Sequence, residues 1–227
     1  MQNPLLKKIN KLDKSSTTTS LLGVTVKEIF LIVLMIASMI ATIQLGYVDI
    51  TMTIIAGIIG FILALIVAFK PNLAPVLAPL YAIAEGALLS AVVVLLEAQF
   101  SGIAIHAVII TVAIALLMAI VYSKEVIKVT SDFQCGIFVC LFVIIAYYMF
   151  GFIFDINIYN SLLSLCINLI IAIVASLCLL IDYKLITEAI DNNMSEEYEW
   201  YCAFSLLVTL IWLYVEILDV LRQIYKD

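Results

Sequence analysis

The sequence has few charged residues and many apolar ones. Asp, Glu, Lys and Arg make up only 12% of its 227 residues, whereas Ala, Val, Ile, Leu, Met, Phe, Trp, Tyr and Cys make up 66%. A soluble globular protein is about 25% charged and about 45–50% apolar. This composition excludes a disordered chain and a soluble enzyme. The formal charge of -6 is not that of a nucleic-acid binder, so we expect no nucleic-acid partner.

Histidine is nearly absent, and the motifs of several enzyme classes are missing. His106 is the single histidine, which excludes a two-histidine zinc site and an H-E-x-x-H membrane protease. The sequence has no phosphate loop and no G-x-G-x-x-G motif. Its five cysteines lack C-x-x-C spacing, and their odd number argues against a disulfide framework. We therefore expect a protein that is not an enzyme and has no cofactor, while the composition leaves metal binding open.

Long apolar runs are abundant instead. Seven segments have the length that crosses about 30 Å of hydrocarbon, and a backbone in lipid must pair its own polar groups, which predicts helices. The predicted fold is an all-α membrane protein with seven transmembrane helices. We expect a mobile basic tail at 1–26, one membrane domain at 27–222 and a short C-terminal tail at 223–227. The spans are about 28–46, 50–69, 73–96, 103–122, 133–153, 158–181 and 200–221. The connection at 182–199 is predicted to be the only sizeable one, and it is acidic.

Basic residues gather on one side of these spans. Nine lysines fall on one side. The connections on the other side contain Asp49, Glu97 and Asp155 and no Lys or Arg, and the C-terminus adds Arg222 and Lys226 there. The positive-inside rule predicts a cytoplasmic N-terminus and an outer C-terminus. The nine are Lys7, Lys8, Lys11, Lys14, Lys27, Lys70, Lys124, Lys128 and Lys184.

The last span carries polar residues at steps of three and four, which places them on one helix face. An ionised carboxylate facing lipid is costly, so we expect this face to look into the helix bundle or onto water. The alternative for Asp219, and less so for Glu216, is that the side chain reaches the outer surface. The stripe consists of Cys202, Ser205, Thr209, Trp212, Glu216 and Asp219.

The span at 158–181 carries a similar stripe that ends at the cytoplasmic side with Asp182. The alternative to a functional role for Asp182 is an interfacial ion pair with Lys184 or Lys70. The stripe consists of Ser161, Ser164, Asn168, Ala172, Ala175 and Asp182.

The third span places Glu85 near the bilayer midplane, deeper than any other acid of the chain. Acids inside the membrane often mark ion or proton paths. The alternative is a structural Glu85 that is hydrogen-bonded to Asn168 or Tyr81. Small residues on the second and third spans predict close helix packing without chemistry. They include Gly57, Gly60, Ala74, Ala78 and Ala82, while the aromatic residues at 142–152 predict lipid contact.

Three stretches resemble the Bax inhibitor-1/YccA-like membrane proteins, especially a divergent bacterial branch, over roughly residues 25–222. They are FKPNLAPVLAPLYAIAEGALLSAV, LLIDYKLITEAI and EWYCAFSLLVTLIWLYVEIL. The resemblance implies six spans around a central seventh and a pH-sensitive calcium leak. It implies a gate of two aspartates on spans 6 and 7, assisted by a basic residue of span 2. Asp182 matches the first aspartate, Thr209 stands where the second is expected, and Lys70 matches the basic residue by rough position.

The leading hypothesis is a pH-responsive cation leak, for calcium or other cations, in a bacterial cytoplasmic membrane. Calcium prefers oxygen ligands, and the acids of the spans supply them. The predicted ion path or pH gate comprises Glu85, Asp182, Thr209 and Glu216, with Lys70, Asn168 and Asp219 as secondary candidates. The alternative is a regulatory partner of membrane proteases or stress machinery that binds another membrane protein through its tail and acidic connection. A proton-coupled transporter is a third, less supported alternative, because no pair of broken helices occurs in matching halves.

Overall fold

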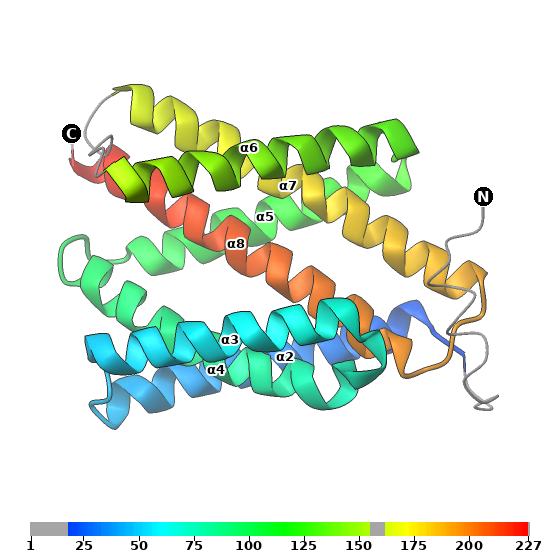
Figure 1. Ribbon diagram of the computed structural model, residues 1–227, viewed down its shortest axis with the longest axis horizontal. Helices are drawn as coiled ribbons and strands as arrows, with labels where there is room; N and C mark the ends of the chain where they lie inside the picture. The colour runs from blue at the N-terminus through cyan, green and yellow to red at the C-terminus, as the bar shows by residue number, and fades with distance from the viewer. Residues whose placement is uncertain (1–17, 155–161, 227) are drawn as a thin grey trace. The chain divides into compact units, whose positions relative to one another are not determined.

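The computed structural model describes residues 18–154 and 162–226, and this part of the chain contains seven helices long and apolar enough to cross a membrane (Figure 1). This confirms a multi-pass, all-α membrane protein whose helices lie in a lipid bilayer. Lys7, Lys8, Lys11, Lys14, Asp155 and Ser161 lie outside the described residues. The helices are α2 (Leu21–Gln44), α3 (Ile50–Phe69), α4 (Ala74–Glu97), α5 (Ile103–Ser123), α6 (Ser131–Phe154), α7 (Leu162–Asp191) and α8 (Tyr198–Lys226), with a 3-10 turn η1 (Pro71–Leu73) before α4.

The helix ends differ from the prediction at three places. Helix α2 begins at Leu21, inside the predicted tail, because the Ser20 hydroxyl accepts a hydrogen bond of 3.0 Å from Gly23 N and caps the helix. Helix α7 runs to Asp191, so the prediction of a long 182–199 connection is wrong. It ends where Asn193 takes a left-handed φ of 49°, which is a common helix stop. Helix α8 includes residues 223–226, which were predicted as tail.

The chain divides into two compact units, which we describe separately. The first unit comprises the described residues up to Val94 together with Leu185–Leu207. The second unit comprises Leu95–Lys184 and the described residues from Val208 onward. The single membrane domain, the orientation across the bilayer and the arrangement of six spans around a seventh stay predictions.

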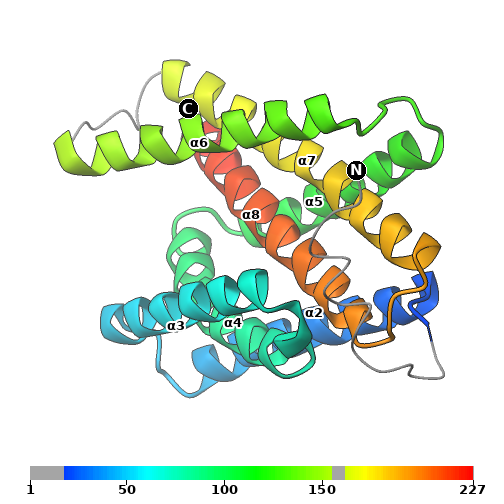
Figure 2. The same ribbon diagram turned by 45° about the vertical axis from the view of Figure 1, so that its right-hand side comes forward.

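In the first unit, α2 and α4 approach closely, and Figures 1 and 2 show α2, α3 and α4 side by side. They meet at Gly86 of α4, where an added Cβ would collide with the carbonyl oxygen of Met35 in α2. Ser38 of α2 donates a hydrogen bond of 2.7 Å to the Ile83 carbonyl beside it. The absence of a side chain at Gly86 therefore permits contact between the two backbones.

Helices α3 and α4 also meet at small residues. An added Cβ at Gly60 would lie 2.9 Å from Glu85 Oε1, and one at Gly57 would lie 2.8 Å from Leu88 Cδ1. Ala74, Ala78 and Ala82 of α4 are fully buried. The packing role that the sequence predicts for these residues is confirmed.

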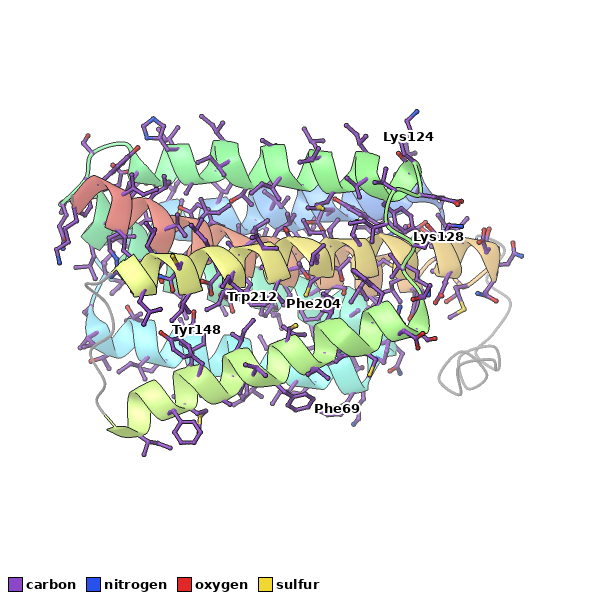
Figure 3. All side chains as sticks on the ribbon, turned by 90° about the horizontal axis from the view of Figure 1, so that it is seen from above. Phe69, Lys124, Lys128, Tyr148, Phe204 and Trp212 are labelled. Carbon is purple, nitrogen blue, oxygen red and sulfur yellow. The ribbon has the colours of Figure 1, made fainter. Side chains whose placement is uncertain are left out.

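In the second unit, polar contacts cap the start of α5 and join α5 to α7. Glu97 accepts hydrogen bonds from Gly102 N at 2.8 Å and from Ala104 N at 2.9 Å, which caps the start of α5. Tyr183 of α7 donates to the Ala115 carbonyl of α5 at 2.9 Å. The connection between α5 and α6 carries Lys124 and Lys128, both exposed (Figure 3).

Candidate functional site

Glu216 has the most informative environment among the predicted site residues. It lies on α8 in the second unit with only 3% of its surface exposed. Its Oε1 accepts hydrogen bonds from the Tyr148 hydroxyl of α6 at 3.0 Å and from Trp212 Nε1 at 2.9 Å. Figure 3 labels both donors, Tyr148 and Trp212. Its Oε2 is buried and has no hydrogen-bond partner among the described residues.

A buried carboxyl group with hydrogen bonds to only one of its oxygens can bind a proton or a cation at the other oxygen. Buried polar atoms without partners are rare because desolvation without compensation is unfavourable. A proton on Oε2 would remove the charge, and a cation beside Oε2 would compensate it. Glu216 can therefore take up either of these without breaking the two hydrogen bonds to Oε1.

Asp219 lies three residues further along α8 in a different setting. Its side chain is 33% exposed and its Oδ1 is 2.9 Å from Nη2 of Arg222. Its charge is thus compensated at the more exposed end of the helix. This geometry fits the surface-directed alternative for Asp219, whereas Glu216 is buried.

The described polar stripe of α7 is buried at most of its positions. Ser164, Asn168, Ala175 and Asp182 are all buried. Ser164 donates a hydrogen bond of 3.1 Å to Gln223 Oε1, which joins the stripe to α8. The described part of this face therefore forms part of the interior of the second unit.

Asp182 and Thr209 belong to the same unit but differ in burial. Asp182 is buried on α7, and Thr209 is half-buried on α8. The nearby Lys184 donates a hydrogen bond of 2.7 Å to the Val129 carbonyl. Glu216 lies seven residues beyond Thr209, about 10 Å along the helix axis, and therefore cannot replace a carboxylate at Thr209.

The first unit holds the other two predicted residues, Glu85 and Lys70. Glu85 is half-buried on α4, where the missing side chain of Gly60 leaves room for its carboxylate. Tyr81, one turn earlier and one of the two alternative partners predicted for Glu85, interacts with this carboxylate. Lys70 is exposed at the end of α3, and within the described residues no ion pair joins it to Glu85.

Sequence reasoning missed a buried ion pair between α2 and the start of α8. Glu199 Oε1 accepts hydrogen bonds from Ser20 N at 2.7 Å and from the Ser20 hydroxyl at 3.0 Å. Its Oε2 pairs with Lys27 Nζ, which also lies 5.7 Å from the ring centroid of Trp200. The only sequence signal was opposite charge at the same predicted end of two spans.

Two further polar residues were also missed. Glu28, in the second turn of α2, is buried. Tyr148 was predicted only to contact lipid, yet its hydroxyl reaches Glu216. The sequence signal for Glu28 was an acid inside an apolar span. The signal for Tyr148 was an aromatic hydroxyl near the depth of Glu216.

Comparison with known families identifies the chain at the family level. The profile of a family described as Bax inhibitor 1 like matches residues 3–226, nearly the whole chain. The chain belongs to the Bax inhibitor 1-like family. No curated protein matches it, and no solved structure matches it. Within the part of this family member that the structure describes, no group of three or more His, Cys, Asp or Glu residues could hold a metal ion.

Proposed function

We propose that this Bax inhibitor 1-like protein is a pH-responsive cation leak in its membrane. The observation that carries the proposal is Glu216, a buried carboxyl with two donors on Oε1 and no hydrogen-bond partner on Oε2 among the described residues. Carboxyl groups inside membrane spans are costly unless they pair with other groups or serve a path for ions or protons. The buried stripe of Ser164, Asn168 and Asp182 on α7 supports the proposal, since it adds oxygen and amide groups in the same unit.

In the proposed path, a moving cation contacts one carboxyl group at a time. The described residues include no cluster of three acids, so the proposal is for an ion in transit and not for a resident metal. Hard cations such as calcium prefer carboxylate and carbonyl oxygen. Calcium is therefore the first ion to test. Asp182 and Thr209 are proposed to lie at the cytoplasmic end of the path and Asp219 at the outer end. A role in ion movement for Glu85 and Lys70, which belong to the first unit, is proposed separately from this path.

The proposal fixes the direction of the pH response. An ionised carboxylate attracts a cation, and a protonated one does not. Lowering the pH adds a proton to Glu216 and removes this attraction. Cation flux through a path that depends on Glu216 should therefore fall as the pH is lowered.

The regulatory alternative receives less support from the described residues. That hypothesis places the contact with a partner partly on the acidic connection before α8. Glu199 is buried and held by Ser20 and Lys27, and Glu196 Oε1 lies 3.7 Å from Lys27 Nζ. The charge of Glu199 is therefore engaged inside the protein and cannot meet a partner.

Purified protein in liposomes tests the proposal directly. We expect calcium entry into dye-loaded proteoliposomes that increases from about pH 6 to about pH 8, with empty liposomes as the control. A leak needs no partner, so the purified chain alone should conduct. If neither calcium nor potassium enters above the empty-liposome rate at any of these pH values, the leak is refuted in favour of the regulatory alternative.

A further inference from the structure

Two aromatic donors hold the same oxygen of Glu216. Tyr148 reaches it from α6, and Trp212 reaches it from one turn earlier on α8. Neither donor bonds Oε2, because that atom has no hydrogen-bond partner among the described residues. The two donors therefore hold the carboxyl group through Oε1 and leave Oε2 without a hydrogen bond from either of them.

The described surroundings of Glu216 hold both charged and neutral groups. Asp219 of the same helix interacts with it electrostatically, and Asp219 itself pairs with Arg222 at 2.9 Å. From α6 the group that faces it is the neutral hydroxyl of Tyr148. The described contact between α7 and this end of α8 joins the neutral groups of Ser164 and Gln223. His106 of α5 bonds Tyr225 of α8 at 2.9 Å, more than two turns beyond Glu216 in the sequence.

We infer that Tyr148 is a positioning residue, which acts with Trp212 to hold Glu216 Oε1 so that Oε2 is the atom that binds a proton in competition with a cation. This inference deepens the proposed function and rests on it for the role of the cation. Proton uptake gives a neutral carboxyl group with its hydrogen on Oε2, and both hydrogen bonds to Oε1 can persist. The two donors favour the ionised form because a charged acceptor makes stronger hydrogen bonds. Tyr148 is thus assigned control over the pH at which Glu216 changes charge.

Trp212 provides a readout that does not depend on transport. The chain has two tryptophans, so Trp200→Phe leaves Trp212 as the sole indole emitter. We expect Trp212 emission to change with pH in one step, and we expect Glu216→Gln to abolish that step. Tyr148→Phe should move the midpoint to higher pH, by roughly half a unit to one unit, because the ionised form loses a donor. Tyr214→Phe is the matched control, since Tyr214 lies on α8 two residues before Glu216 and on another helix face. Its midpoint should equal that of the parent.

The outcomes separate the inference from the proposed leak. A pH step that persists in Glu216→Gln, or a Tyr148→Phe midpoint equal to that of Tyr214→Phe, would overturn the inference. A step that behaves as expected in a protein without flux would support the proton site and refute the leak. If Trp200→Phe does not fold, the indole N–H resonance of Trp212 in wild-type protein labelled at tryptophan measures the same titration, with the same variants and the same deciding results.

Discussion

Replacing Glu199 by Ala should destabilise the protein by about 3–5 kcal/mol, the range observed when one partner of a buried ion pair is removed. The side chain of Glu199 is 3% exposed and that of Lys27 is 14% exposed, so the ammonium left behind would remain poorly hydrated. The Ser20 backbone N–H would lose its acceptor as well. Equilibrium unfolding in mixed detergent micelles measures the change in the free energy of unfolding.

Glu196→Ala is the matched control for this ion pair. Glu196 also faces Lys27, but its distance is 3.7 Å and its side chain is 52% exposed. Exposed ion pairs contribute about 0–1 kcal/mol, so this variant should stay close to wild type. Adding Lys27→Met to Glu199→Ala should recover part of the loss, because it removes the unpaired charge. Equal stabilities for Glu199→Ala and Glu196→Ala would contradict the assignment of a buried pair.

Replacing Gly86 by Ala should also destabilise the protein, by about 1–3 kcal/mol, the range for overpacking a closely packed interior. The new Cβ would meet the Met35 carbonyl oxygen, which is backbone and cannot rotate away, and would lie 2.9 Å from Ser38 Cβ. Helices α2 and α4 must then separate, which weakens the hydrogen bond from Ser38 to Ile83. The same unfolding measurement applies.

Gly136→Ala is the control for Gly86→Ala. Gly136 is helical in α6, and among the described residues no atom beyond its chain neighbours and the nearby backbone of its own helix lies within 4 Å of an added Cβ. Alanine in a helix is about 0.5–1 kcal/mol more favourable than glycine, so this variant should be unchanged or more stable. A Gly86→Ala protein as stable as Gly136→Ala would show that α2 and α4 do not approach at Gly86.

The helices could be predicted from the sequence because each contains an apolar run of sufficient length, and lipid requires the backbone of such a run to be helical. The ends were harder to predict because local caps decide them. Ser20 starts α2 before the apolar run begins, and Asn193 stops α7 after charged residues that can continue a helix beyond the membrane.

The candidate site could be predicted only in part. Periodicity placed the residues from Cys202 to Asp219 on one face of α8, and Glu216 is buried there. The partners of that face could not be predicted, because Tyr148 is 68 residues away in the sequence and belongs to a helix with no polar stripe. The pair of Lys27 and Glu199 is separated by 172 residues. Contacts over such distances depend on how the helices pack, which hydrophobic periodicity does not specify.

Calcium flux through Glu216→Gln, measured beside wild type in the same liposome preparation, tests the central claim most directly. Gln keeps the size of Glu and an oxygen that can accept from Tyr148 and Trp212, but it cannot carry the charge that attracts a cation. A lost charge interaction of about 1.5–3 kcal/mol corresponds to a roughly ten- to hundredfold loss of flux at about pH 8. Asp219→Asn, at a more exposed carboxylate already paired with Arg222, should lose much less. Wild-type flux in a folded Glu216→Gln protein would contradict the account.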